Sequence, residues 1–165
     1  MSDLVVARQP FIDGEWVAGA GAVVAVESPS TGDTFTTVDG CSPAQVDAAI
    51  AAARRAFDDG PWPALSMAER VDAVRRLGDA LVSRRSALVE TVIAEAGCPR
   101  GVTEVAQVGM ALASIDELAD LAAGLPEWEH NEVPLGQHVA GSTVRLSIRR
   151  YAPAGVVAAI TPAGA

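Results

Sequence analysis

The chain has 165 residues and a formal net charge of −9, and half of its residues are hydrophobic although only 4% are aromatic. No apolar run approaches the ~18 residues that a membrane span needs, and the amino terminus has no basic stretch followed by a long apolar one, which excludes a secretory signal. The acidic balance disfavours nucleic-acid partners. We therefore expect a globular, cytoplasmic protein with one sizeable core and no membrane contact.

The chain has two cysteines, two histidines and no lysine. Cys41 and Cys98 lie far apart without metal-type spacing, and we interpret them as reduced thiols, with a disulfide or a reactive thiol as the alternatives. His130 and His138 lie in a proline-containing segment. Nothing in this segment indicates that further ligands converge on the two histidines, so we expect no metal site. All 12 basic residues are arginine, which excludes Schiff-base chemistry by a lysine of this chain.

The first 40 or so residues carry the signs of two hairpins. An Asp-Gly turn lies between the apolar flanks of residues 11–17. A second extended pair, residues 22–26 and 34–38, brackets the Ser, Pro, Gly and Asp of residues 28–33, which are typical turn residues.

Helical signals follow. Ser42 with Gln45, and Ser66 with Glu69, each form a capping-box pattern that begins a helix. A third helix begins near residues 83–86 and ends at Gly97, and a fourth spans about residues 102–123 before Gly124. The apolar faces that we expect to be buried are Val46, Ala49, Ile50, Ala53 and Phe57; Val71, Val74, Leu77 and Leu81; Leu88, Val89, Val92 and Ile93; and Val105, Val108, Leu112, Ile115, Leu118, Ala119 and Ala122.

The carboxyl-terminal part is extended. Residues 125–141 contain prolines and glycines and are predicted to form a loop. Residues 142–151 alternate between apolar and polar, which indicates a half-buried strand, whereas the unbroken apolar run 156–160 is typical of a strand covered on both faces. Ligands bind at the carboxyl ends of such strands, although Thr161-Pro162 after a strand is by itself more typical of a turn.

Several stretches, in the same order along the chain, resemble the amino-terminal part of the NAD(P)-dependent aldehyde dehydrogenase superfamily. The segment from Pro153 to Pro162, Pro-Ala-Gly-Val-Val-Ala-Ala-Ile-Thr-Pro, is similar to the family's Pro-Val-Gly-Val-Val-Gly-X-Ile-Thr-Pro. The other matching stretches are residues 11–17, 28–33, 46–57 with Trp62 and residues 68–70, and 94–99. The resemblance extends over essentially the whole chain.

The resemblance implies an α/β protein that is the amino-terminal portion of an aldehyde-dehydrogenase-like fold. Its parts are hairpin strands, four helices, an oligomerisation strand and the first strand of an incomplete Rossmann-like cofactor domain. We expect residues 1–141 to form the hairpins and the helical part of the cofactor-binding domain. Residues 142–151 are then the oligomerisation-type strand, and residues 152–165 the truncated start of the Rossmann-like sheet.

The resemblance also implies a reaction, the oxidation of an aldehyde to a carboxylic acid through a cysteine thiohemiacetal. NAD or NADP is the implied cofactor, beside whose ribose and nicotinamide Ile160, Thr161 and Pro162 would lie, and the implied assembly is a homodimer or homotetramer. The family's nucleophilic cysteine and general-base glutamate lie farther along than this chain. We therefore expect no catalytic residue within it, and neither turnover nor tight cofactor binding by it alone.

One departure from the family bears on catalysis. The family has Trp-Asn where this chain has Ala163-Gly164, and the resemblance gives that Asn side chain the role of donating to the oxyanion. Glycine has no side chain, and losing one such donor typically costs on the order of 10²–10³ in turnover.

Two kinds of protein fit these residues. The first is an amino-terminal fragment of an aldehyde dehydrogenase, inactive as it stands. The second is a complete, short, non-catalytic helical interaction module that pairs with a partner or a full-length homologue. An unpaired apolar strand invites aggregation, so a chain that ends just after residues 156–160 favours the fragment.

Overall fold

The computed structural model describes residues 9–132 and 147–160. Its elements in chain order are β1 (Phe11–Ile12), β2 (Glu15–Trp16), β3 (Val23–Glu27), β4 (Thr34–Asp39), α1 (Pro43–Asp58), the 3-10 turn η1 (Trp62–Ala64), α2 (Met67–Val82), α3 (Arg85–Ala96), α4 (Arg100–Val102), the π-helical turn η2 (Thr103–Gln107), α5 (Gly109–Ala123), β5 (Trp128–Asn131) and β6 (Ser147–Arg150).

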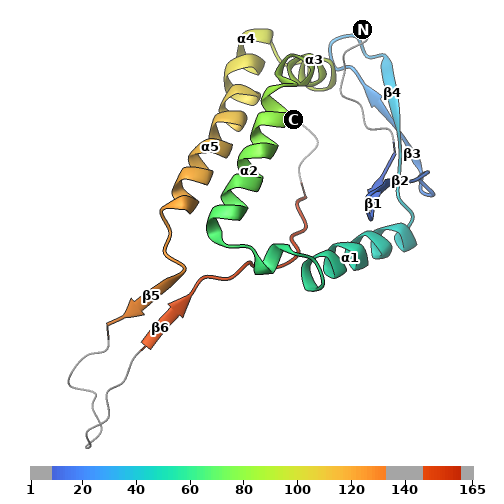
Figure 1. The fold of residues 1–165 in the computed structure, drawn as a ribbon. Coiled ribbons are helices and arrows are strands. Elements are labelled where there is room, and N and C mark those ends of the chain that lie inside the picture. Colours follow the sequence, from blue (N-terminus) through green and yellow to red (C-terminus); the bar gives the residue numbers. More distant parts are fainter. Residues whose placement is uncertain (1–8, 133–146, 161–165) are drawn as a thin grey trace, which may run out of the picture.

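The elements form an open ring with one projecting arm (Figure 1). Helices α2 and α5 lie side by side on one side of the ring, the β3–β4 ribbon lies on the other, and α1 and α3 connect the two sides. The β5–β6 ribbon projects away from the ring. The described part of the chain is therefore the expected mixture of hairpin strands and helices.

Both predicted hairpins are confirmed. Strands β1 and β2 pair antiparallel, and the rings of Phe11 and Trp16 meet edge to face with their centroids 5.0 Å apart. Strands β3 and β4 also pair antiparallel, with an irregularity between Val26 and Glu27. The turn between them packs on the end of α3, where Gly97 has φ 64° and a Cβ atom would lie 2.8 Å from Pro29.

The predicted helix starts are confirmed in atomic detail. Ser42 Oγ accepts a hydrogen bond from the Gln45 backbone N–H, while Gln45 Oε1 accepts one from the Ser42 N–H at 3.1 Å. Ser66 and Glu69 repeat this reciprocal pair at the start of α2. Each box satisfies backbone donors that a helix leaves unpaired in its first turn.

The apolar stripe of α1 is not buried as predicted. Val46 and Ile50 are 46% and 57% exposed, and Ala52 is the buried residue of the helix. Helical periodicity marks the face that a helix can bury, and on this face Ala49 and Phe57 are half-buried while Val46 and Ile50 stay exposed.

The fourth predicted helix is divided by a π-helical turn. The Val108 N–H donates to the Thr103 carbonyl, one residue farther back than in an α-helix. The Glu104 carbonyl accepts from Arg85 Nη2 at 2.8 Å, and a Cβ atom at Gly109 would lie only 2.6 Å from that carbonyl oxygen. The hydrophobic periodicity predicts one uniform helix here and gives no sign of the extra residue in this turn.

The core lies where α2, α3 and α5 meet. Val89, Val108 and Leu112 are buried together, with Leu81, Leu88, Val92, Ile93 and Ile115 packed around them. Gly78 of α2 lets α5 approach closely, since a Cβ atom there would lie 3.2 Å from Ile115. The predicted burial of Leu77, Val105 and Leu118 is wrong, because these side chains are more than half exposed.

Two predictions for the carboxyl-terminal part need correction. The expected loop of residues 125–141 contains β5, which pairs antiparallel with β6 in the register Trp128↔Arg150. The expected strand of residues 156–160 is not formed, and Val157 and Ile160 are 77% and 94% exposed. A strand needs a neighbour to accept its backbone hydrogen bonds, and no described strand lies beside it.

Residues 142–146 of the predicted strand lie outside the described residues, whereas residues 147–150 are extended as expected. Within the described ranges, no helix is both long and apolar enough to cross a membrane.

Candidate functional site

The candidate site is the segment that follows β6, because the sequence-predicted cofactor residues come at its end. Ile160 is the last described residue and is almost fully exposed. Thr161 and Pro162 lie outside the described residues, as do Ala163 and Gly164. The described part of the site is therefore residues 151–160, which lead to them.

Tyr151 attaches the beginning of this segment to the ribbon. Its backbone N–H donates to the Glu127 carbonyl at 3.1 Å, and its Oη donates to Glu129 Oε2 at 2.9 Å. Arg149 Nη1 donates to the same carboxylate oxygen at 3.3 Å, and its Nη2 donates to Asn131 Oδ1 at 3.1 Å. These groups form a polar network along one face of the β5–β6 ribbon.

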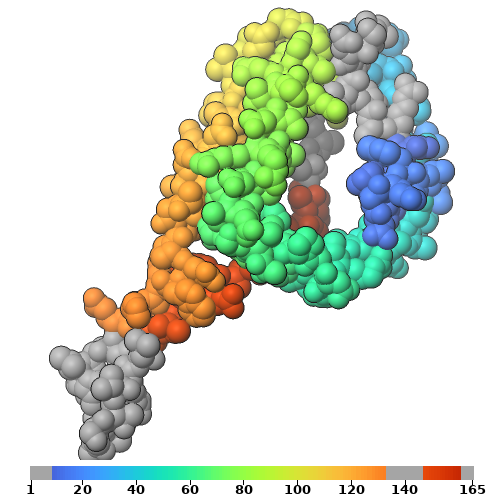
Figure 2. Space-filling view, in the orientation of Figure 1, coloured from blue at the N-terminus to red at the C-terminus, as the bar shows by residue number. Residues whose placement is uncertain are grey.

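The segment then runs between two hollows. One, of about 560 Å³, is mostly apolar and lies against α2 and α5. The other, of about 580 Å³, lies between the base of the ribbon and the start of α2 and is more polar. Both are lined by Met67, Arg70 and residues 151–153. Figure 2 shows the segment, in red, inside the open middle of the ring.

At Gly155 the segment passes close to α1. Gly155 has φ 110°, a value that favours glycine. Its ideal Cβ position lies 3.8 Å from Arg54 Nη1, and Arg54 in turn pairs with Asp58 and lies over the Phe57 ring. The side-chain hydrogen bond from Arg54 lowers the pKa of Asp58, which keeps this carboxylate ionised.

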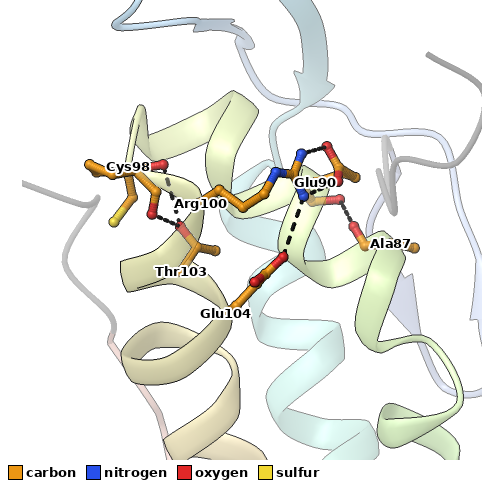
Figure 3. A network of polar contacts seen from close by, with 8 residues as sticks. Ala87, Glu90, Cys98, Arg100, Thr103 and Glu104 are labelled. Carbon is orange, nitrogen blue, oxygen red and sulfur yellow. Dashed lines mark hydrogen bonds and ion pairs between the residues drawn. The ribbon is translucent and has the colours of Figure 1, made fainter.

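The remaining electrostatic features stabilise helix ends. Hydrogen bonds from Ser66 lower the pKa of Glu69, and the hydrogen bond from Arg100 lowers the pKa of Glu90. Arg100 also contacts Glu104 at 3.6 Å, as Figure 3 shows. A general acid or base working near neutral pH usually needs a pKa moved toward neutrality, and these shifts move carboxylates away from it.

Among the described residues, the cysteine thiols and the other potential metal ligands form no cluster. Cys41 is exposed, Cys98 is half-buried, and both are free. Thr103 Oγ1 lies 3.4 Å from the Cys98 carbonyl and 3.2 Å from the Pro99 carbonyl (Figure 3), a contact that belongs to the helix start. In residues 9–132 and 147–160, no group of three or more His, Cys, Asp or Glu side chains is placed to hold a metal ion.

Sequence reasoning missed the role of Tyr151 and Glu129. The one tyrosine of the chain closes an alternating strand, which is a weak signal for an anchor. The sequence predicts a loop around Glu129, and a loop offers this residue no cross-strand partner. The arrangement as a whole can hold an extended segment, with the carboxylates of Glu69 and Glu127 lining the hollow beside its start.

Comparisons with known proteins show which family the chain resembles. A family model described as the aldehyde dehydrogenase family matches residues 16–162. The chain is 34% identical over 155 residues to N-succinylglutamate 5-semialdehyde dehydrogenase of Chromobacterium violaceum, covering 92% of this chain and 29% of that protein. It is 36% identical over 154 residues to the protein of that name from Burkholderia mallei, with the same coverage.

Solved structures show the same likeness. Betaine aldehyde dehydrogenase from Staphylococcus aureus in complex with NAD+ superposes with a TM-score of 0.71 at 26% identity, covering 78% of this chain and 26% of that one. An aldehyde dehydrogenase from Mycobacterium tuberculosis complexed with NAD+ gives 0.70 at 30% identity, covering 75% and 26%. The likeness confirms the expected fold, and the chain spans less than a third of the length of these relatives.

Proposed function

The chain belongs to the aldehyde dehydrogenase family, and we propose that it is the amino-terminal part of an NAD(P)-dependent enzyme that oxidises an aldehyde to a carboxylic acid. The observation that carries this proposal is the family match, which begins in the first hairpin and runs through Pro162. The match includes the whole segment that approaches the proposed cofactor site.

Ile160, Thr161 and Pro162 are the proposed cofactor-binding residues. The almost complete exposure of Ile160 supports this role, because an apolar side chain held away from its own core is free to cover an apolar part of a ligand. Bound NAD(P) would supply the acceptor for the hydride. In this proposal the segment forms one wall of the site and orients the cofactor.

We propose that this chain alone has no turnover and binds the cofactor weakly. Covalent aldehyde oxidation needs a nucleophile, a base and a bound cofactor together. Neither Cys41 nor Cys98 lies on the segment that approaches the cofactor residues. The family resemblance assigns both the nucleophile and the base to later residues.

The β5–β6 ribbon is the proposed oligomerisation element. It projects from the ring in Figure 1, and an isolated two-stranded ribbon is only marginally stable in water, so a partner surface would stabilise it. The division into residues 1–141, 142–151 and 152–165 is kept as a proposal with one change. Strand β5 belongs with β6, so the oligomerisation element begins before residue 142.

The test combines an intact mass with an activity. The native protein is purified from cytoplasmic extracts of its source, where we propose that it is located, and its mass is compared with the 16.9 kDa of this chain. We expect a much larger mass that co-purifies with aldehyde-dependent reduction of NAD+ or NADP+. A native mass near 16.9 kDa without activity contradicts the proposal and supports an interaction module.

A second measurement tests the proposed inactivity. The purified 165-residue chain is mixed with NAD+ and with N-succinylglutamate 5-semialdehyde, the aldehyde named by its curated relatives. We expect no reduction of NAD+, and no binding of NAD+ by calorimetry at micromolar concentration. Turnover by this chain, or micromolar affinity, would overturn the proposed inactivity.

A further inference from the structure

Helix α5 has one buried face and one acidic face. On the buried face, Leu112 belongs to the core shared with α2 and α3, and Ala119 is buried as well. The acidic face carries Asp116, Glu117 and Asp120, all of which are exposed. These two faces by themselves would describe an ordinary amphipathic helix at the surface of a protein.

A third face of α5 is apolar but exposed. Leu118, Leu121 and Leu125 follow one another at intervals of three and four residues, which places them in one line along the helix. Their side chains are between 48% and 69% exposed, and the exposed Met110 extends the line toward the start of α5. Single exposed apolar residues are common on protein surfaces, whereas a contiguous apolar patch marks a contact. A helix that is apolar on two sides is typical of one packed between two layers.

This apolar face adjoins the path of the segment that follows β6. Leu118 lines the hollow of about 560 Å³ together with Val74 of α2 and Val157 of the segment. In the proposed function, the larger part of an enzyme follows this segment in the same polypeptide. The chain covers 29% of its relative from Chromobacterium violaceum, so the remaining 71% of that length is more than twice as long as the matched part.

We propose that Leu118, Leu121 and Leu125 form a surface on which the later part of the same polypeptide packs, so that α5 is an inner helix of the complete enzyme. This inference rests on the proposed function and names what covers this face. A second copy of the chain is the other candidate. Its proposed contact is the β5–β6 ribbon, which projects away from the ring (Figure 1).

The test measures how fast a thiol on each exposed face of α5 reacts with a water-soluble maleimide in the complete enzyme. Leu121→Cys places the thiol on the apolar face. Ala113→Cys is the matched control, because position 113 is exposed and lies in line with Asp116 and Asp120. Peptide mass spectrometry distinguishes each site from the natural cysteines. We expect position 121 to react at least about tenfold more slowly than position 113, because a covered thiol reacts only when the structure opens locally.

A second variant separates cover by the same chain from cover by a second copy. Leu121→Ala removes a side chain that we expect to be packed inside one polypeptide. It should lower the thermal midpoint of the complete enzyme by several degrees and leave the size of its assembly unchanged. Ala113→Ser, on the acidic face, should change neither. The measurements are thermal unfolding and sedimentation velocity.

The outcomes are distinguishable. Equal reactivity at positions 121 and 113 would show that the apolar face stays exposed in the complete enzyme, and would overturn this inference while the proposed function stands. Dissociation of the Leu121→Ala assembly into smaller species would assign the face to a second copy and would also overturn it. A native protein of 16.9 kDa without activity overturns the proposed function and this inference with it.

Discussion

The side chain of Thr36 places a polar atom in a buried position. It lies on β4 and is 8% exposed, and its hydroxyl is buried without a hydrogen-bond partner among the described residues. A buried hydroxyl that is not bonded loses its contact with water without compensation. Valine has nearly the same shape and no polar atom.

We therefore predict that Thr36→Val raises the stability of the protein by about 1 kcal/mol. The measurement is the free energy of unfolding from urea titration. Thr37→Val, at the neighbouring exposed position of β4, is the control and should change stability by less than about 0.5 kcal/mol. A loss of stability in Thr36→Val would mean that the hydroxyl is bonded after all.

At the scale of single residues, Gln45 makes both contacts that the sequence predicts and contacts that it does not. Its capping role follows from a local pattern, the serine three residues earlier. The same side chain also accepts from the Ala20 N–H and donates to the Ala18 carbonyl, both at 2.8 Å. These partners are more than twenty residues away, and no local pattern encodes such a contact.

At the scale of elements, Arg100 joins α3 to the helical turns that follow it. Its guanidinium pairs with both carboxylate oxygens of Glu90, at 2.6 and 3.0 Å, and reaches Glu104 (Figure 3). The hydrogen bond from Arg100 lowers the pKa of Glu90 below its ordinary value of 4.5. The contribution of this contact to stability is thus fully present above about pH 4.5 and is lost as the pH falls through the lowered pKa.

We predict that Glu90→Gln lowers the thermal midpoint at neutral pH and that this difference disappears in acid. Both side chains are about half exposed, so solvent screening keeps the effect small. The measurement is thermal unfolding of the two proteins from neutral to acidic pH. Glu117→Gln is the control, because Glu117 is exposed and makes no ion pair with another described residue, and it should show no such difference.

The elements were predictable where their signals are local. Capping boxes, the turn between β1 and β2, and the glycine that ends α3 are encoded within a few residues, and all of them are present. Strand β5 was missed because its pairing depends on cross-strand contacts such as Arg149 with Glu129. The π-helical turn was missed because a distant side chain, Arg85, satisfies the carbonyl that it frees.

Residues 153–162 were predictable only as a family motif. The segment passes Tyr151 and the two hollows beside it, which arise where the ribbon meets the start of α2. This contact joins elements that are far apart in the sequence. The alternation of residues 142–151 predicts a strand, but it does not predict what the last residue of that strand contacts.

At the scale of the whole molecule, α2, α5 and the segment after β6 leave apolar surface uncovered. The apolar hollow between α2, α5 and the segment is continuous with Val157, and the exposed side chains of α5 include Leu118 and Leu121. Contiguous apolar patches on a protein surface mark interaction sites or cause association. The net charge of −9 opposes association between copies.

We predict that the apolar surface outweighs the charge and that the purified 165-residue chain self-associates at micromolar concentration. Added salt should strengthen the association, because salt screens repulsion between acidic copies and leaves apolar contacts intact. The measurement is sedimentation velocity at low and high salt. Val157→Asp places a charge in the apolar hollow and should shift the chain toward monomer.

Ala48→Asp is the matched control for this last change. Ala48 is exposed on α1, on the opposite side of the helix from the stripe of Val46, Ile50 and Phe57. Ala48→Asp adds the same charge outside the apolar surface. A larger shift toward monomer in Val157→Asp than in Ala48→Asp is therefore due to the hollow. A monomeric chain with a cooperative melt would contradict the prediction and would favour a stand-alone interaction module over part of a larger enzyme.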